Sequence, residues 1–225
     1  MRTLRADRLL TNVAVAISAI VLALLVVRAA TTADMSWDTT AYHKPFSARL
    51  VGMCDKACFT MDALMESRYA SFPAAAEFVK GVMWRVTGNP EAPNFLALFS
   101  LIALVAYLQV SWRVPWYWST VAFLAIPLVQ AHATSEYVDL SPNVAIAIAC
   151  LVLLKLQLEP ESWAWGSLLT FGAATIYAAN AKLVLLPVSG ILCAVLGVMF
   201  LFREHRRGGM FRRAALIGSG WLVVL

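Results

Sequence analysis

Long apolar runs separated by short polar segments form the dominant pattern along this chain. Residues 9–27 contain no charged side chain, and residues 92–110 form a second run of the same kind. A helix needs about 20 mostly apolar residues to cross the hydrocarbon core of a bilayer. We therefore expect a first membrane-spanning helix at 9–30 and a further spanning helix that begins at residue 92.

Two longer apolar stretches, 116–158 and 163–202, each exceed the length of one crossing and predict two. Polar positions around 132–136 interrupt the first stretch, and those around 180–182 interrupt the second. A last run, 214–225, is too short to span and ends with the sequence. We therefore expect an all-α, polytopic transmembrane helix bundle. It would be a single integral membrane domain with about six complete spans and a truncated seventh, the N-terminal portion of a longer protein.

The basic N-terminus allows two interpretations. Three arginines precede the first apolar run, as in a secretory signal peptide, and Ala29-Ala30-Thr31 would lie near a cleavage point. The apolar run is longer than the about 7–15 residues of a signal-peptide core. We therefore favour an uncleaved first helix.

The distribution of positive charge predicts an orientation. Five arginines lie between residues 203 and 213, and Arg113 and Lys155 lie in other short loops on the same side as the N-terminus. Cytoplasmic loops of membrane proteins carry an excess of Lys and Arg. We expect a multi-pass protein of the cell (inner) membrane, with a cytoplasmic N-terminus and with residues 31–91 as an external loop.

The predicted external loop, 31–91, is too long for a simple connection. Apolar residues recur at helical spacing in three groups within it: Tyr42, Phe46, Leu50 and Met53; Met61, Leu64 and Met65; and Phe78, Val82, Met83 and Val86. Each group makes one apolar stripe beside charged residues, as in amphipathic helices that lie on a membrane surface. We therefore expect juxtamembrane helices in this loop.

Composition agrees with a membrane protein and excludes other classes. The 225 residues are 61% hydrophobic and 14% charged, with a mean hydropathy of +0.73. Soluble domains are usually about 45–50% apolar and about 25% charged, so a soluble enzyme, a disordered chain and a secreted disulfide scaffold are excluded. The net charge of +5 is too scattered for a nucleic-acid partner. Cys54 and Cys58 lie in the external loop, where we expect a structural disulfide.

Several polar residues on the predicted outer side are candidates for chemistry. Asp38 shares a helix face with Tyr42 through i, i+4 spacing, and His43 follows directly. A carboxylate just above the bilayer surface, next to a phenol and an imidazole, can act as a general base on a hydroxyl. The structural alternative for Asp38 is an N-cap, and the two roles can coexist.

Further charged residues lie near the predicted outer ends of later helices. Glu136 and Asp139 lie near the rim of the fourth span, where the cost of a charge is modest. Lys182 interrupts an apolar run, so it either lines a cavity that suits a phosphate or extends to the lipid headgroups. Asp38, His43 and Glu136 are a possible divalent-metal site, although nothing in their spacing requires one.

The segment Trp37-Asp38-Thr39-Thr40-Ala41-Tyr42-His43, placed after a first span, resembles the loop signature of the GT-C superfamily. These are membrane glycosyltransferases that take sugars from polyprenyl-phosphate carriers. Three later features resemble the same pattern in the same order: Ser71-Phe72-Pro73 with Glu77, Thr87-Gly88 and Asn94; Tyr137-Val138-Asp139-Leu140; and Ala181-Lys182-Leu183 followed by Pro187. The resemblance runs from about residue 9 to residue 190.

The resemblance implies inverting transfer of a hexosyl or pentosyl group from a polyprenyl-phosphate sugar to an acceptor hydroxyl on the extracytoplasmic side. The acceptor would be a glycan, a lipid or a protein. By resemblance Asp38 is the catalytic carboxylate, and Lys182, with Arg49 or Arg68, neutralises the lipid phosphate. The remaining residues of the implied substrate site are Tyr42, His43, Glu136 and Asp139.

Two other functions stay open at this point. A lipid-linked sugar transporter or flippase would use similar polar residues without covalent chemistry, and a non-catalytic membrane assembly subunit would need none of them. Transporters place charge near the bilayer midplane on broken helices. Here the charges gather at one rim beside a structured loop, which favours an enzyme.

Overall fold

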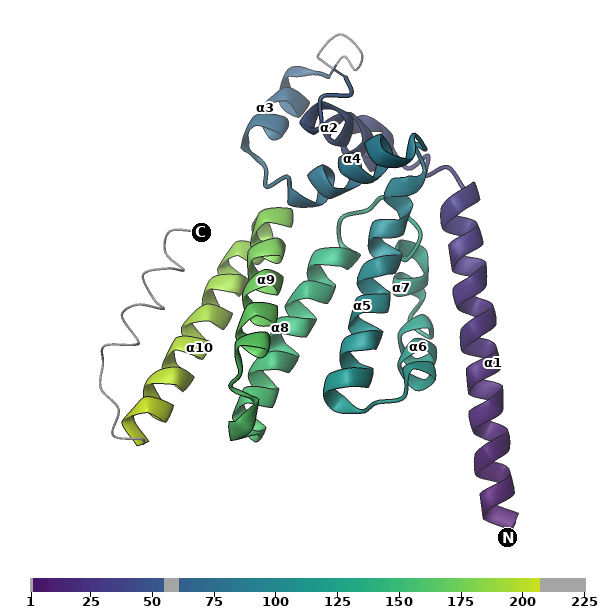
Figure 1. The fold of residues 1–225 in the computed structure, drawn as a ribbon. Helices are drawn as coiled ribbons and strands as arrows, with labels where there is room; N and C mark the ends of the chain where they lie inside the picture. The colour runs from purple at the N-terminus through teal and green to yellow at the C-terminus, as the bar shows by residue number, and fades with distance from the viewer. Residues whose placement is uncertain (1, 55–60, 207–225) are drawn as a thin grey trace. The chain divides into compact units, whose positions relative to one another are not determined.

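The computed structural model describes residues 2–54 and 61–206. Within these residues every regular element is a helix, so the predicted all-α class is confirmed (Figure 1). Four helical segments are long and apolar enough to cross a membrane: Asp7–Thr31, Ala92–Trp112, Leu140–Leu158 and Leu183–Arg203. The predicted spans at 9–30 and from residue 92 coincide with the first two. The truncated run at 214–225 lies outside the described residues.

The chain divides into two compact units, which are described one at a time. The first unit comprises Met1–Ser71 and Glu77–Ser141, and the second comprises Phe72–Ala76 and Pro142–Leu225. The elements of the first unit, in chain order, are α1 (Arg2–Thr31), the π-helical turn η1 (Thr39–His43), α2 (Lys44–Leu50), α3 (Ala63–Ser71), α4 (Ala75–Thr87), η2 (Ala92–Asn94), α5 (Phe95–Trp112), α6 (Trp116–Leu124) and α7 (Pro127–His132).

Helices α1, α5 and α6 pack against one another around an apolar core (Figure 1). This core is made of Leu25, Leu98, Leu101, Leu124 and Ala133. The hydroxyl of Ser18 on α1 donates a hydrogen bond of 2.9 Å to the backbone carbonyl of Tyr117 on α6. The Asn94 side chain donates to the carbonyls of Ala29 and Thr32 at 3.2 and 3.0 Å, so the start of α5 is tied to the end of α1.

The apolar stretch after α5 is broken into two short helices. Helix α6 ends at Leu124, and Pro127 opens α7, because proline is tolerated in the first turn of a helix but not in its interior. The Gln130 side chain donates a hydrogen bond to the carbonyl of Leu124, which the break leaves without its helical partner. Residues 133–139 then separate α7 from α8, at the polar cluster that the sequence predicted.

Helix α4 exposes its apolar face and buries its charged face, the reverse of a helix in a soluble domain. Its apolar residues Phe78, Val82 and Val86 are exposed, whereas Glu77 and Lys80 are buried. An exposed apolar face opposite a packed polar face is the arrangement of a helix whose outer side meets lipid. The helix expected in this part of the loop is therefore present, and its charged face forms the interior of the first unit.

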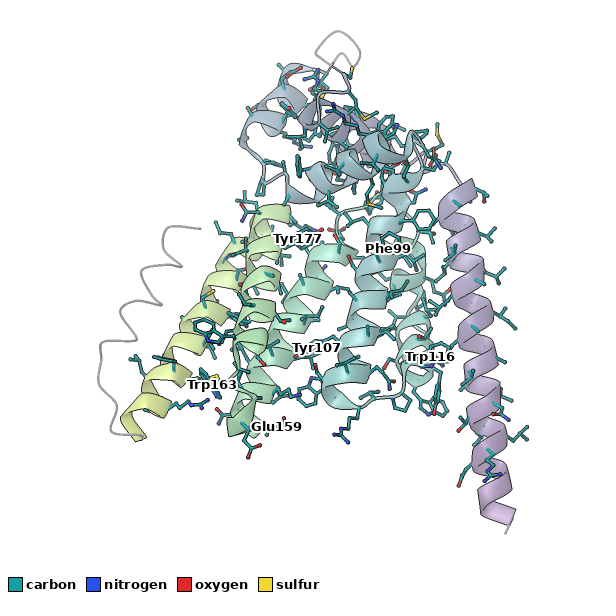
Figure 2. The ribbon with its side chains drawn as sticks, viewed as in Figure 1. Phe99, Tyr107, Trp116, Glu159, Trp163 and Tyr177 are labelled. Atoms are coloured by element: carbon teal, nitrogen blue, oxygen red, sulfur yellow. The ribbon has the colours of Figure 1, made fainter. Side chains whose placement is uncertain are left out.

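The second unit consists of α8 (Leu140–Leu158), η3 (Pro160–Ser162), α9 (Trp165–Ala181), η4 (Leu183–Leu185) and α10 (Leu186–Arg206). Its core contains Ala145, Ala178 and Leu185. The predicted interruption near residue 182 is present, since α9 ends at Ala181 and Lys182 has extended backbone. Figure 2 shows Trp163 and Glu159 together at one end of this unit and Tyr177 toward the other. The Trp163 ring lies under the Arg203 guanidinium at 4.8 Å.

The four cysteines fall into two kinds. Cys150 on α8 and Cys193 on α10 are free. Cys54 is disulfide-bonded. Cys58, its expected partner, lies outside the described residues.

Candidate functional site

Asp38 lies directly before η1, in the segment that follows the first apolar helix. An Asp at such a position commonly caps a helix through its side chain. Asp38 occupies the N-cap position of η1, but its side chain makes no capping hydrogen bond. Its half-buried carboxylate interacts with other side chains instead.

Two phenols face the Asp38 carboxylate. Burial, together with the charge and hydrogen bonding of Asp38, raises the pKa of Tyr42 well above its usual range. Hydrogen bonding to Asp38 is the main cause of the raised pKa of Tyr137, which lies between α7 and α8. Both phenols therefore keep their protons at neutral pH and act as hydrogen-bond donors to the carboxylate.

Asp34 anchors the same region from the end of α1. Its Oδ1 atom accepts the backbone N–H of Ser36 at 3.0 Å, and its Oδ2 atom accepts the Thr39 hydroxyl at 2.9 Å and the backbone N–H of Glu136 at 2.8 Å. Burial works against ionisation of Asp34, but these hydrogen bonds outweigh it and hold its pKa below the usual range. Asp34 is therefore an ionised carboxylate with fixed partners.

Glu136 is fully buried and is held at three points. Its backbone N–H donates to Asp34, its backbone carbonyl accepts from the Lys80 ammonium, and its Oε1 atom lies 3.2 Å from Nζ of Lys44. Burial raises the pKa of this carboxyl to about 7, against the attraction of Lys44 and Lys80. Glu136 thus joins residues 133–139 to the segments around α1, α2 and α4.

Lys44 bridges two carboxylates of the first unit. Its Nζ atom lies 3.2 Å from Glu136 and 3.3 Å from Oε1 of Glu91. Burial opposes the charge on Lys44, but the two carboxylates outweigh it and raise the pKa of the ammonium. Lys44 therefore stays charged at neutral pH, and it is not available as a base.

His43 and Glu77 form a buried pair. The Nδ1 atom of His43 lies 2.8 Å from Oε1 of Glu77. Burial lowers the pKa of His43, which keeps the imidazole neutral. Burial would raise the pKa of Glu77, but the bond to His43 and the nearby Lys80 charge hold it below the usual range. Since an ionised carboxylate only accepts hydrogen bonds, Nδ1 of His43 carries the proton.

Lys80 lies at the centre of this charged group and is 1% exposed. Burial lowers the pKa of its ammonium, while the carboxylates of Glu77, Glu136, Asp34 and Asp139 act in the opposite direction. A buried lysine is tolerated where it is paired and hydrogen-bonded. Here it connects α4 to the segment that carries Tyr137.

The structure brings most of the predicted site residues together in the first unit, but not all of them. Asp38 and Tyr42 face each other, with Tyr137 between α7 and α8, and His43, Glu136 and Asp139 belong to the surrounding charged group. His43 and Glu136 are buried, so they support the site and do not line its surface. Lys182 follows α9 and belongs to the second unit.

The two predicted arginines have structural partners in α3. Arg49 donates from Nη1 to both carboxylate oxygens of Glu66, at 2.8 and 3.0 Å, and its guanidinium lies 5.7 Å from the centre of the Tyr69 ring. Arg68 is half-buried, with Nη1 4.0 Å from the sulfur of Met65. The contacts of Arg49 tie α2 to α3.

Sequence reasoning did not find four of the residues that build this site: Asp34, Lys44, Lys80 and Glu91. A signal for Lys80 was present, because it shares a helix face with Glu77 at i, i+3 spacing, opposite the apolar stripe of α4. No local pattern marks Asp34, Lys44 or Glu91. Their contacts within the charged group, from Asp34 to Glu136 and from Lys44 to Glu91, join segments that are distant in the sequence.

Metal binding by Asp38, His43 and Glu136 was a possibility from the sequence. In the part of the chain that the structure describes, no three His, Cys, Asp or Glu side chains are grouped to hold a metal ion. His43 binds Glu77, and Glu136 pairs with Lys44. These side chains are therefore engaged with protein partners.

The arrangement provides one partly exposed carboxylate on a rigid, charged support. Asp38 receives two phenol hydrogen bonds, and the elements that carry these groups are fixed by Asp34, Glu136 and Lys80. Such a carboxylate can orient a hydroxyl or accept its proton.

Comparisons with known proteins do not assign this chain to a family. A scan against protein-family models found no match, and searches of curated proteins and of solved structures found none either.

Proposed function

We propose that this chain is a GT-C-type glycosyltransferase, or part of one, which transfers a sugar from a polyprenyl-phosphate carrier to an acceptor hydroxyl. The observation that carries the proposal is the partly exposed Asp38 carboxylate between Tyr42 and Tyr137, backed by a buried charged group. It lies in the segment whose sequence resembles the GT-C loop signature.

In the proposed reaction, the acceptor hydroxyl gives its proton to a carboxylate oxygen of Asp38. The hydroxyl oxygen forms a bond to the anomeric carbon of the donor sugar, and the bond from that carbon to the phosphate oxygen breaks. The electron pair of the broken bond leaves with the polyprenyl phosphate. Attack opposite the leaving group inverts the anomeric configuration. Asp38 then returns its proton to solvent, and the Tyr42 and Tyr137 phenols keep the carboxylate oriented.

The same proposal includes a topology of six spans. The broken pair α6–α7 and helix α9, which has 17 residues, would cross the bilayer in addition to the four long apolar helices. A cytoplasmic N-terminus in the cell (inner) membrane then puts the Asp38 site on the extracytoplasmic side. The support for this orientation is the excess of Lys and Arg in the loops of the opposite side.

The test is an Asp38→Asn variant of the full-length protein in membranes that contain a radiolabelled polyprenyl-phosphate sugar. Asparagine keeps the size of the side chain but cannot accept the proton, so we expect transfer to fall by about 100- to 10,000-fold. The matched control is Asp7→Asn, the same chemical change at an exposed position in the first turns of α1. Transfer at the wild-type rate by Asp38→Asn would show that Asp38 is not the catalytic carboxylate.

A lipid-linked sugar flippase is the second candidate, and one observation favours it. The α6–α7 segment is a broken helix within an apolar stretch, of the kind that transporters use at their binding sites. Reconstituted protein that moves a lipid-linked sugar across vesicles without consuming it would support this candidate over the enzyme.

A further inference from the structure

Two cavities of the first unit meet at Arg28, in the last turn of α1. One is a groove between α1 and α6, with a volume of about 360 Å³. The other is an outer pocket beside the segment that carries Tyr137, with a volume of about 380 Å³. Arg28 lines both. Each volume lies within the usual range of small-ligand sites, about 300–1,000 Å³.

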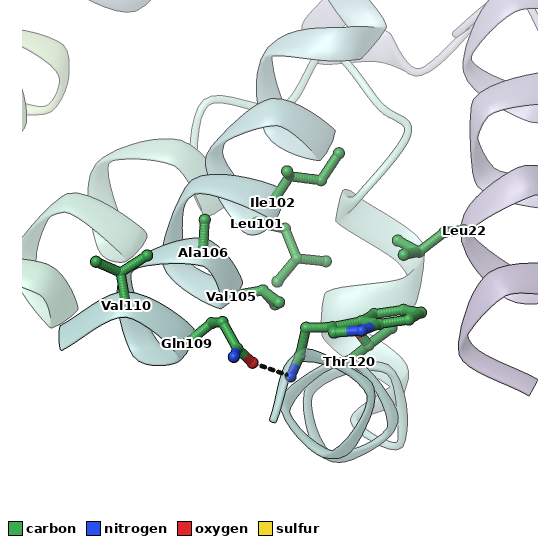
Figure 3. Close-up of a pocket in the computed structure, with 9 residues that line it drawn as sticks. Leu22, Leu101, Ile102, Val105, Ala106, Gln109, Val110 and Thr120 are labelled. Atoms are coloured by element: carbon green, nitrogen blue, oxygen red, sulfur yellow. Dashed lines mark hydrogen bonds between the residues drawn. The ribbon is translucent and has the colours of Figure 1, made fainter. Parts of the chain in front are cut away.

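The groove between α1 and α6 is mainly apolar. Its walls include Val21 and Leu25, which lie in the first membrane-spanning candidate, Asp7–Thr31, and Leu124 at the end of α6. Thr120, which lines the groove, also lines a third cavity of about 320 Å³ between α1, α5 and α6 (Figure 3). At the far end of that cavity, the Gln109 side chain accepts the backbone N–H of Trp116 at 2.8 Å.

The outer pocket is polar and adjoins the candidate site. Asp34 and Tyr137 line it, and Tyr137 also faces Asp38. Thr134 lines it as well and is 5% exposed, yet its hydroxyl has no hydrogen-bond partner among the described residues. The buried Nδ1 atom of His132 has none there either. Buried polar atoms are normally hydrogen-bonded, so these two groups point to a polar ligand in the pocket.

Arg28 is an unusual residue for its position. In the proposed topology it lies at the outer end of α1, against the general placement of Arg on the cytoplasmic side. A cation in the last turn of a helix is favourable to the helix dipole. Within the described residues the guanidinium makes no ion pair or hydrogen bond, so its charge is open to an anion.

We propose that Arg28 binds the phosphate of a polyprenyl-phosphate lipid whose chain lies in the groove between α1 and α6 and whose sugar enters the outer pocket. This inference rests on the proposed function for the identity of the sugar-bearing lipid. Charge complementarity selects the phosphate, because a guanidinium binds phosphate oxygens in a bidentate manner. The apolar groove at the depth of the membrane selects the hydrocarbon chain.

The polar groups of the outer pocket match a sugar better than a second phosphate. Asp34 is an ionised acceptor for sugar hydroxyls and would repel a further anion. The Thr134 hydroxyl and His132 Nδ1 gain the partners that they lack. A sugar held there lies next to Tyr137, whose phenol is hydrogen-bonded to Asp38.

The experiment measures binding and needs no turnover. Full-length protein in nanodiscs is titrated with three probes: polyprenyl monophosphate, the uncharged polyprenol of the same length, and inorganic phosphate. Arg28→Gln removes the cation, and Arg8→Gln is its control at the other end of α1. Ala125→Trp fills the groove that Ala125 lines directly after α6, and Ala122→Trp is the control on α6 outside the groove.

We expect Arg28→Gln to weaken polyprenyl monophosphate binding at least about 10-fold and to leave polyprenol binding unchanged. Ala125→Trp should weaken both lipids, and neither control should weaken either. If Arg28→Gln binds polyprenyl monophosphate as tightly as the wild type, Arg28 does not bind the phosphate. If Ala125→Trp and Ala122→Trp bind the lipids equally well, the hydrocarbon chain does not lie in the groove. If inorganic phosphate displaces polyprenyl monophosphate at an equal concentration, the site binds phosphate alone and the lipid is not its occupant.

The Asp38→Asn variant separates this inference from the proposed function. It should bind polyprenyl monophosphate like the wild type, because Asp38 does not line either cavity. If binding depends on Arg28 while Asp38→Asn transfers sugar at the wild-type rate, the lipid site stands and the catalytic proposal fails. If Asp38→Asn abolishes transfer while Arg28→Gln binds normally, the catalytic proposal stands and this site is wrong.

Discussion

The backbone N–H of Glu136 donates a hydrogen bond of 2.8 Å to Oδ2 of Asp34, a residue 102 positions earlier in the chain. Asp34 precedes Asp38 by four positions, and Glu136 precedes Tyr137 directly. This one bond therefore fixes the two segments that bring the Tyr137 phenol to the Asp38 carboxylate.

The raised pKa of Glu136 predicts a pH dependence of stability. Burial raises this pKa from 4.5 to about 7 in the folded protein. The folded state then binds the proton more tightly than the unfolded state, so the contribution of Glu136 to stability is complete below pH 4.5 and falls as the pH rises to about 7. The change should be on the order of 3 kcal/mol in the free energy of unfolding.

The measurement compares unfolding of the wild type and of Glu136→Gln in the same detergent, from about pH 4 to about pH 8. Glutamine imitates the protonated carboxyl and does not titrate. The wild type should lose stability relative to the variant across this range. Parallel profiles for the two proteins would contradict a buried, titrating Glu136.

Removal of the Tyr137 hydroxyl should slow transfer without unfolding the protein. A hydrogen bond to a charged group is worth about 1.5–3 kcal/mol, so Tyr137→Phe should lower kcat/KM about 10- to 100-fold. Tyr69→Phe is the control, because Tyr69 packs against Phe46 and Arg49. Equal rates for the two variants would exclude a role of the Tyr137 phenol in orienting Asp38.

Arg49 should prove to be a structural residue. Its guanidinium is bound to Glu66 by two hydrogen bonds from Nη1, so Arg49→Ala should destabilise the folded state by about 1–3 kcal/mol. Transfer per folded molecule should stay at the wild-type level. A double-mutant cycle with Glu66→Gln measures the coupling between the two residues. A rise in the KM for the donor without loss of stability would instead support the role implied by the GT-C resemblance, binding of the lipid phosphate.

Gly81 should be sensitive to a single methyl group. A Cβ atom at this position would lie 2.3 Å from the carbonyl oxygen of Ser47 and 2.8 Å from Cγ1 of Val51, so α4 could not keep its approach to α2. Gly81→Ala should cost about 1–3 kcal/mol of stability. Gly190→Ala is the control in α10, where a Cβ atom meets nothing within 4 Å, and it should be neutral or stabilising. A Gly81→Ala protein as stable as the control would mean that the two helices can separate without cost.

Element boundaries were predictable where the chain itself carries the signal. Apolar length alone located the helices at Asp7–Thr31 and Ala92–Trp112. Polar residues located the interruptions before α8 and after α9. The break at Pro127 was visible as a proline within the apolar stretch, but two short helices separated at that point were not expected, because a proline can also kink a continuous helix.

The charged interior of the first unit was not predictable in the same way. Asp38 and Tyr42 share a local spacing, and this part of the site was found from the sequence. The contacts of Lys80 with Glu136 and of Lys44 with Glu91 join residues 56 and 47 positions apart. Such pairs depend on tertiary packing, and no local pattern in a single sequence indicates which distant residues will meet.

The contact between Lys80 and Glu136 also constrains how the protein is made. In the proposed topology, Lys80 is delivered across the membrane with the first external loop, whereas Glu136 is synthesised 56 residues later. At about 5–20 residues per second the ribosome needs about 3 to 11 seconds for that distance. During this interval the positive charge of Lys80 has no Glu136 carbonyl to meet, and the inward face of α4 must stay hydrated. The first external loop therefore reaches its final packing only after the α6–α7 segment has been inserted.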